Sequence, residues 1–195
     1  MPTPYKRARN ASDMQVEPAA KLLGVEKRTL LRYESDTDKS DPPPDIVYKM
    51  SQIYRAPWLL AAHCKQKCDI GRHLGYELLN NINLDPVYVL GKLREELQEA
   101  VEATDKLLSR VITRQGRWSD FSEAEKRDNT KDLHELLDAE HNIEVLKMVL
   151  GAWVDMPGEI RRHNDKCYLH GYAVTKGQVP DYVMAVAETA ASYNP

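Results

Sequence analysis

Three basic side chains on one short segment carry the most specific chemistry in this 195-residue sequence. Lys27, Arg28 and Arg32 lie within six residues, so a helix would present them on its outer side. At this spacing, ammonium and guanidinium groups can donate hydrogen bonds to base edges in the major groove of DNA. The alternative is an ordinary helix whose basic face is simply solvated, and short helical pairs of that kind are common. The cations alone leave both interpretations open.

Two short helices joined by a tight turn have to position these cations. Gly24 stands where a C-terminal glycine ends a helix, and Ala20 is small enough to let two helices cross closely. A second helix is predicted from about residue 26 to residue 33. The residues predicted to face inward are Met14, Ala19, Leu22 and Leu23 on the first helix and Leu30 and Tyr33 on the second. The spacing is therefore coherent with a helix-turn-helix whose second helix enters the major groove.

The three cysteines are an odd number and do not form the disulfide framework of a secreted protein. Cys64 and Cys68 share a face if their helix continues, and His163 with Cys167 repeats the same spacing. Together these four side chains could supply the ligands of a tetrahedral zinc site. Small buried cysteines at a domain joint are the commoner outcome. We therefore expect no metal and no cofactor.

Catalytic motifs are weaker still. His134 and His141 have carboxylates beside them, at Glu135 and Glu140, but they lack the i, i+4 histidine pair of a zinc hydrolase. A glycine-rich phosphate loop and a nucleophile elbow are also absent from the sequence. Charges on the solvated face of a helix account for this pattern, so the sequence predicts no enzyme.

Helical periodicity continues through the rest of the chain, and strand signals are nearly absent. Pro44 and Pro57 each stand where a helix can begin, after a polar turn at 35–44 that no regular element would survive. Ser122 and Glu125 form a capping box that predicts a second long helix from about 123 to 153. The inward stripes predicted for the two long helices are Leu90, Leu93, Leu97, Ala100, Thr104, Leu107 and Val111, and Leu133, Leu136, Leu137, Ile143, Leu146, Leu150, Trp153 and Val154.

These signals predict an all-α protein with three parts. Residues 1–75 form a five-helix DNA-binding module, and residues 83–155 form a long antiparallel helical hairpin. Residues 156–195 are a tail in which Pro180 starts a short last helix. A hairpin alone leaves an apolar seam in water, so a second copy of the chain or the N-terminal module must cover it.

Composition agrees with this division. The net charge is -3, but residues 1–75 carry 13 Lys/Arg against 9 Asp/Glu, and residues 76–195 carry 14 against 21. This asymmetry suggests a basic contact module joined to an acidic, solvated one. The N-terminus lacks a signal peptide and the densest apolar runs are too short to span a membrane, so we expect a cytoplasmic protein with no membrane partner.

Residues 3–62 resemble the lambda-repressor-like, Xre-type helix-turn-helix family. The resemblance rests on Ala20, Gly24, Val25, Leu30, Arg32, Tyr33 and Glu34, and on Pro44, Asp45, Ile46 and Tyr54 in the next helix. It implies that Lys27, Arg28 and Thr29 face base edges, that Gln15, Lys21 and Arg32 hold phosphates, and that Lys6, Arg7 and Arg9 add positive charge.

Two positions depart from the family pattern. Glu26 stands where the family usually has a Ser or Thr cap, and Val16 stands where it has a Gln. Glu26 could accept a hydrogen bond from a cytosine amine, although it would also repel nearby phosphates. Gln15 could replace the missing Gln from one position earlier. The departures affect base reading and leave the predicted fold unchanged.

Residues 63–73 are similar to a cysteine-containing junction of Xre-type regulators from Gram-positive bacteria and their phages, where it precedes a helical hairpin. Together the two resemblances imply a sequence-specific transcriptional regulator, bacterial or phage, that binds a palindromic operator in double-stranded DNA. Because such an operator requires two modules at a fixed spacing and the two long helices leave apolar surface in water, we expect a homodimer through residues 86–154. One alternative is a protein-interaction adaptor with a degenerate helix-turn-helix, which the acidic loop at Asp36, Asp38 and Asp41 suggests. Another is a metal- or redox-responsive regulator.

Overall fold

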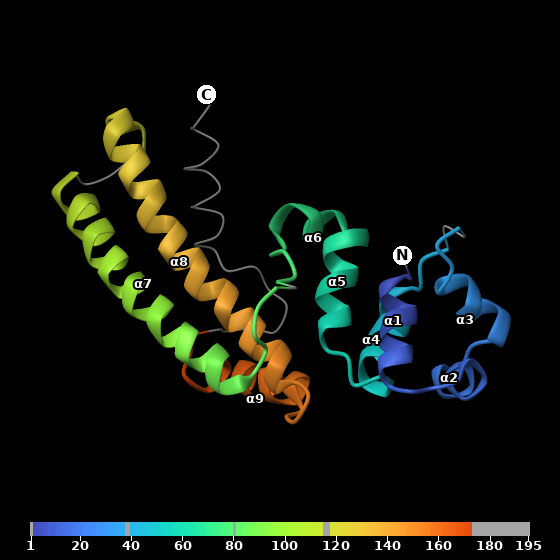
Figure 1. The fold of residues 1–195 in the computed structure, drawn as a ribbon. Helices are drawn as coiled ribbons and strands as arrows, with labels where there is room; N and C mark the ends of the chain where they lie inside the picture. Colours follow the sequence, from blue (N-terminus) through green and yellow to red (C-terminus); the bar gives the residue numbers. More distant parts are fainter. Residues whose placement is uncertain (1, 38–39, 80, 115–117, 173–195) are drawn as a thin grey trace. The chain divides into compact units, whose positions relative to one another are not determined.

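The computed structural model describes residues 2–37, 40–79, 81–114 and 118–172, and all regular structure within these ranges is helical (Figure 1). The α-helices are α1 (Pro4–Ala11), α2 (Val16–Leu23), α3 (Lys27–Tyr33), α4 (Pro44–Ile53), α5 (Trp58–Lys67), α6 (Asp69–Leu74), α7 (Pro86–Arg114), α8 (Glu123–Leu150) and α9 (Met156–Leu169). A short 3-10 helix, Trp118–Asp120, precedes α8. The predicted all-α class is confirmed. The helix predicted to begin at Pro180 lies outside the described residues.

Helices α1 to α5 share one hydrophobic core at the N-terminal end of the chain. The buried side chains of this core are Tyr5, Ala8, Ala19, Ala20, Leu23, Leu30, Ile46, Val47, Met50, Tyr54, Ala56 and Leu59. The inward positions predicted for Ala19, Leu23 and Leu30 are correct, whereas Leu22 is 61% exposed. Leu22 and Leu23 are neighbours on a helix and point about 100° apart, so the tight core accepts only one of them. The short helix α6 contacts α5 and buries none of its own residues.

A buried ion pair connects the first helix to the end of the third. Arg9 Nε and Nη2 donate to the two carboxylate oxygens of Glu34 at 2.7 and 2.8 Å. The same guanidinium donates from Nη1 to the Met14 carbonyl at 2.7 Å, so one side chain fixes α1, the turn before α2 and the end of α3. The hydrogen bond to Glu34 raises the pKa of Arg9 above its ordinary value. Bidentate pairing supplies both energy and a defined orientation.

A second polar contact connects α1 to α5. The Tyr5 hydroxyl lies 2.8 Å from His63 Nδ1. Burial, with a smaller effect from the charge of Asp41, raises the pKa of Tyr5 to about 12, so the phenol keeps its proton. Burial lowers the pKa of His63, which keeps the imidazole neutral near pH 7. With both groups neutral, the imidazole tautomer decides which of the two atoms donates.

Helices α7 and α8 lie side by side as an antiparallel hairpin (Figure 1). Glu96 on α7 lies near Glu135 and Asp138 on α8, whereas Arg110, further along α7, meets Asp132, which comes earlier on α8. Residue numbers therefore rise along α7 as those of their partners fall along α8, which shows that the two helices are antiparallel. At the start of α8, Ser122 forms the predicted capping box with Glu125.

The register of the hairpin corrects the predicted stripes. On α7 the buried residues are Val89, Leu93, Glu96, Ala100 and Ala103, and on α8 they are Asn129, Asp132, Ala139 and Val145. Only Leu93 and Ala100 of the predicted α7 stripe are buried, while Leu90 and Leu97 are exposed. On α8, Leu133, Leu137 and Ile143 are exposed as well, and Trp153 and Val154 lie exposed beyond the end of that helix at Leu150. The side chain of Val111 lies outside the described residues.

Polar contacts and small residues explain this register. Arg110 Nη1 donates to Asn129 Oδ1 at 2.9 Å and to Asp132 Oδ2 at 2.5 Å, and Asn129 is almost completely buried. A buried polar group without a partner costs more than an exposed leucine, so satisfying these groups takes precedence. Ala103 and Ala139 line the same seam and let the helices approach closely. Several bulky apolar residues of the heptads, among them Leu90, Leu97 and Leu133, consequently remain exposed.

The segment after α6 contacts α8. The Tyr76 hydroxyl donates to Glu140 Oε2 at 2.9 Å, and the Tyr76 ring stacks on His141 with 4.7 Å between centroids. His141 Nε2 lies 2.9 Å from the carbonyl oxygen of Glu77. Partial burial and then the Glu140 hydrogen bond raise the pKa of Tyr76 to about 12, so the phenol remains a donor. By their contacts, residues 1–154 form one unit and residues 155–195 another.

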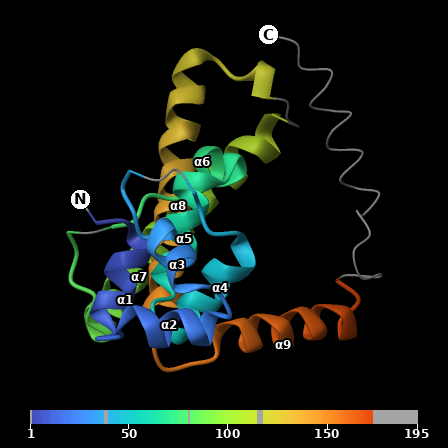
Figure 2. The same cartoon turned by 90° about the vertical axis from the view of Figure 1, so that its right-hand side faces the viewer.

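The second unit contains α9, which Figure 2 shows as one uninterrupted helix. Asp155 is its N-cap and accepts a hydrogen bond from the Gly158 amide, and Pro157 lies in its first turn. No helix is predicted from the sequence here, because residues 160–168 are charged. The sequence Asp155-Met156-Pro157 was the signal that could have predicted the helix, because Asp is a favoured N-cap residue and the first turn of a helix tolerates Pro.

Replacing Arg9 with Ala is expected to destabilise the N-terminal core by about 3–5 kcal/mol, because the buried Glu34 carboxylate would lose its partner. Urea unfolding followed by far-UV circular dichroism measures the change. The matched control is Glu17→Ala, which removes an exposed ion pair with Lys27 and should cost no more than about 1 kcal/mol. Equal losses in the two variants would show that the Arg9–Glu34 pair does not stabilise the fold.

Candidate nucleic-acid interface

The turn between α2 and α3 has the geometry that a helix-turn-helix requires. Gly24 adopts the left-handed conformation at φ 70° and ψ 31°, which glycine enters without the steric cost of a Cβ. The Val25 amide donates to the Ala20 carbonyl at 3.0 Å and closes the end of α2. Ala20 is buried at the crossing, as predicted. The turn therefore fixes the direction in which α3 leaves α2.

Helix α3 separates an inward residue from an outward basic face. Leu30 is completely buried in the core and anchors the helix. Lys27, Arg28 and Arg32 are exposed, and Thr29 is half-buried. The three predicted contact cations thus lie on solvent-facing positions of one helix. This is the arrangement that reading a groove of DNA requires.

Two of these cations have partners at the surface. Lys27 Nζ lies 3.1 Å from Glu17 Oε2, with both side chains mostly exposed. Arg32 Nη2 donates to Ser40 Oγ at 2.8 Å. Exposed ion pairs contribute little free energy, so a phosphate or a base can replace such partners at small cost. Glu17 lies on α2 and Lys27 on α3, so their ion pair holds the lysine side chain beside the turn between the two helices.

The other predicted contact residues lie on helix ends and surfaces. Gln15 is the exposed N-cap residue of α2, and Lys21 is exposed on the same helix. Lys6 and Arg7 are exposed on α1. Glu26 is the exposed N-cap residue of α3 and makes no side-chain capping hydrogen bond. Its carboxylate is therefore available to a donor outside the domain.

Arg9 is the exception among the predicted residues. Its side chain is buried in the bidentate pair with Glu34 and does not lie on the surface with Lys6 and Arg7. A guanidinium that holds the core together is not available to a phosphate. Arg9 is therefore removed from the predicted set of DNA contacts. Its partner is 25 residues away, so local sequence alone did not show the pairing.

Leu31 is an outward residue of α3 that the sequence analysis did not consider. It is 47% exposed and lies three residues after Arg28. The i, i+3 spacing was the available signal, because it places the leucine on the same side of the helix as the arginine. The solvent-facing side of α3 is therefore basic and includes one apolar residue, Leu31.

The acidic loop before α4 is partly neutralised. Asp41 pairs with Lys67 of α5 at 2.9 Å, whereas Asp36 is exposed. Asp38 lies outside the described residues. The pairing of Asp41 weakens the observation that favoured an adaptor with a degenerate helix-turn-helix.

The four candidate zinc ligands fall in two pairs, one in each unit of the chain. Helix α5 ends at Lys67, and Cys68 follows with an extended backbone, so the helix on which Cys64 and Cys68 would share a face does not continue. On α9, Cys167 Sγ lies 3.7 Å from His163 Nε2. Each pair is described within its own unit of the chain. The expectation of no metal stays a prediction.

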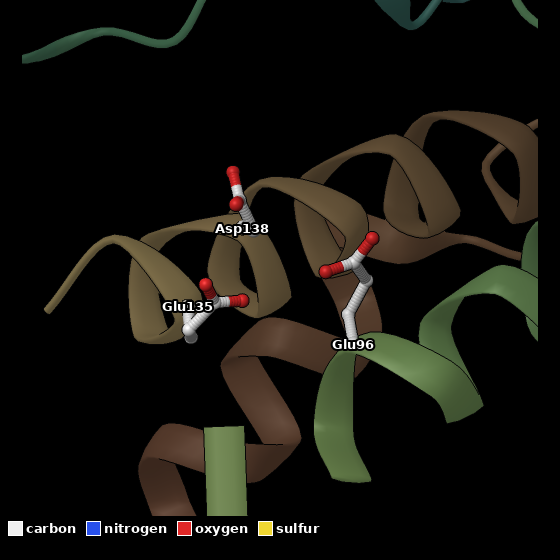
Figure 3. A group of neighbouring side chains, drawn as sticks. All are labelled: Glu96, Glu135 and Asp138. Atoms are coloured by element: carbon white, nitrogen blue, oxygen red, sulfur yellow. The ribbon is translucent and has the colours of Figure 1, made fainter. Parts of the chain in front are cut away.

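A different cluster of acidic side chains lies on the hairpin. Figure 3 shows Glu96 on α7 and Glu135 and Asp138 on α8, whose nearest oxygens all lie within 4.8 Å of one another. Lys92 Nζ already pairs with Glu96 Oε1 at 2.8 Å. Because this lysine neutralises part of the charge, we interpret the cluster as part of the polar hairpin seam rather than as a metal centre.

Comparison with known proteins agrees with the geometry of the first helices. Residues 6–58 match the model of a helix-turn-helix family, that of Xre and lambda-repressor-like regulators. The match covers about a quarter of the chain and includes most of α1 and all of α2, α3 and α4. It supports a DNA-binding transcription regulator at the level of the family. Neither the curated proteins nor the solved structures that were compared match this chain.

Alanine at Lys27 or Arg28 is expected to weaken binding to a selected duplex by about 1–3 kcal/mol, with a smaller effect on random duplex, because each side chain would lose contacts with a base. Arg32→Ala is expected to weaken both duplexes equally, because a phosphate contact carries no sequence information. Fluorescence anisotropy with labelled duplexes measures both affinities.

The control is Lys131→Ala, which removes one exposed positive charge from α8. It should leave both affinities unchanged. Equal losses on selected and random DNA for Lys27, Arg28 and Arg32 alike would contradict the assignment of base reading.

Proposed function

We propose that this protein is a sequence-specific transcriptional regulator of bacterial or phage type, which binds a palindromic operator as a homodimer. The observation that carries the proposal is the exposed basic face of α3, presented by a turn that Gly24 fixes. Exposed cations on α1 and α2 can hold the phosphates on either side. Because the partner is DNA, we place the activity in the cytoplasm. Among the described residues, none of the helices is long and apolar enough to cross a membrane.

Binding to double-stranded DNA is expected to weaken steeply with salt. If Lys6, Arg7, Lys21 and Arg32 of each copy contact phosphates, a dimer neutralises about eight of them, and affinity should fall roughly 1,000-fold or more between 50 and 200 mM salt. Anisotropy titrations with a duplex selected from a random library test this. A protein that selects no duplex and instead purifies with a stable protein partner would support the adaptor hypothesis.

The hairpin supplies the reason to propose a dimer. On α7, Leu90, Leu97, Val101 and Leu108 are exposed at intervals of seven, four and seven residues. These intervals fit the a and d positions of a heptad, with the polar residues Arg94 and Thr104 at the two positions between them. Leu133 and Leu137 on α8 are exposed at i, i+4. Apolar stripes of this length are costly in water, because burying a leucine or valine contributes about 1.5–3 kcal/mol.

We assign the stripe to a second copy of the chain. A heptad stripe is self-complementary, and two copies related by a two-fold axis bury the same residues on both sides. Such an axis also presents two reading helices to two operator half-sites about one helical turn apart. The proposed dimer therefore accounts for the exposed leucines and for a palindromic site together.

Glutamate at Leu97 or Val101 is expected to convert the dimer into a monomer, because each change would bury charges at the proposed interface. Both residues are exposed in the single chain, so each variant should fold normally. Light scattering at about 10 µM gives the mass. The matched control is Leu74→Glu, a change at a leucine of α6 that is 80% exposed and lies outside the hairpin. A monomeric wild-type protein, or a dimeric Leu97→Glu variant, would contradict this interface.

A further inference from the structure

An apolar residue interrupts the basic surface of the reading helix. Leu31 lies three residues after Arg28 and four after Lys27, so the three side chains occupy one face of α3. Its neighbour Leu30 is completely buried and already supplies the anchor of the helix in the core. Leu31 is therefore not needed to hold α3 in place.

The position of Leu31 restricts what it can contact. A single exposed leucine is common on protein surfaces and by itself needs no explanation. Leu31, however, lies among cations that are proposed to contact base edges and phosphates. Docking of α3 in the major groove would bring Leu31 against the bases together with Arg28. A leucine offers no hydrogen bond to a base edge. The one apolar group that the major groove presents is the 5-methyl group of thymine.

We propose that Leu31 selects thymine in each half-site through contact with this methyl group. The inference rests on the proposed function and deepens it by naming one chemical feature of the operator. Lys27 and Arg28 are suited to purine acceptors, and Leu31 adds a preference that hydrogen bonding cannot provide. Thymine is accordingly expected within the segment of each half-site that α3 covers.

Replacement of thymine by deoxyuridine tests the proposal, since deoxyuridine keeps the base pairing and removes only the methyl group. The probe is the tightest 30-base-pair duplex that the full-length protein selects from a random library, prepared with deoxyuridine at one symmetric pair of thymines at a time. One methyl-sized group is worth about fourfold in affinity, and two half-sites give roughly fifteenfold. The wild-type protein is expected to lose affinity by this factor at one symmetric pair.

The variant Leu31→Ala is expected to bind the thymine and deoxyuridine duplexes equally, with an affinity near that of wild-type protein for the deoxyuridine duplex. The control is Leu22→Ala, which truncates another exposed leucine of the same domain and should keep the wild-type discrimination. Duplex selection with no sensitivity to any deoxyuridine, or an unchanged ratio in Leu31→Ala, would overturn the role of Leu31 alone. Failure to select any duplex would overturn the proposed function and this inference together.

Discussion

The buried pair of Arg9 and Glu34 is the interaction on which the N-terminal domain depends. It holds the end of the reading helix against α1, and a third hydrogen bond from Arg9 to the Met14 carbonyl fixes the chain as it enters α2. Removing a charge of this kind from water is costly, and two hydrogen bonds to the carboxylate compensate only in one geometry. The pair therefore specifies orientation as much as stability. A helix that reads base edges needs this, because a small rotation would move its side chains away from their acceptors.

In the hairpin, too, buried polar groups are paired, but there the pairing sets the register of two helices. Its seam satisfies polar groups first, through Arg110, Asn129 and Asp132, and uses alanines where the helices approach. Leu93 and Val145 are buried in the seam, but many of the other bulky apolar residues are left exposed. Stability within one chain is therefore lower than the leucine content suggests, while the surface available to another chain is larger. In this arrangement polar partners set the register of the pair, and Leu90, Leu97, Leu108, Leu133 and Leu137 remain exposed.

Local signals predicted the helix ends well, because each of them acts within one turn. Gly24, Pro44 and Ser122 stand at the ends where glycine, proline and a capping box were expected. The register of α7 was not predictable in the same way. Residues 89, 93, 96 and 100 fit a heptad as well as residues 90, 93, 97 and 100, and hydrophobicity favours the second set. The partners of Glu96 and Arg110 decide between them, and those partners are known only once the helices meet.

The same distinction applies to the candidate site. The exposed positions of Lys27, Arg28 and Arg32 follow from helical spacing around Leu30, so sequence sufficed. The burial of Arg9, in contrast, depends on its pairing with Glu34, which is 25 positions away in the sequence. In the dimer that we propose, the spacing of the two α3 helices would depend on how firmly residues 1–75 are connected to the hairpin. Tyr76 stacks on His141 and donates to Glu140, so the connection is made by side chains beyond the covalent linker. In that proposed dimer, this contact would restrict the distance between the two half-sites more than an unconstrained chain of the same length.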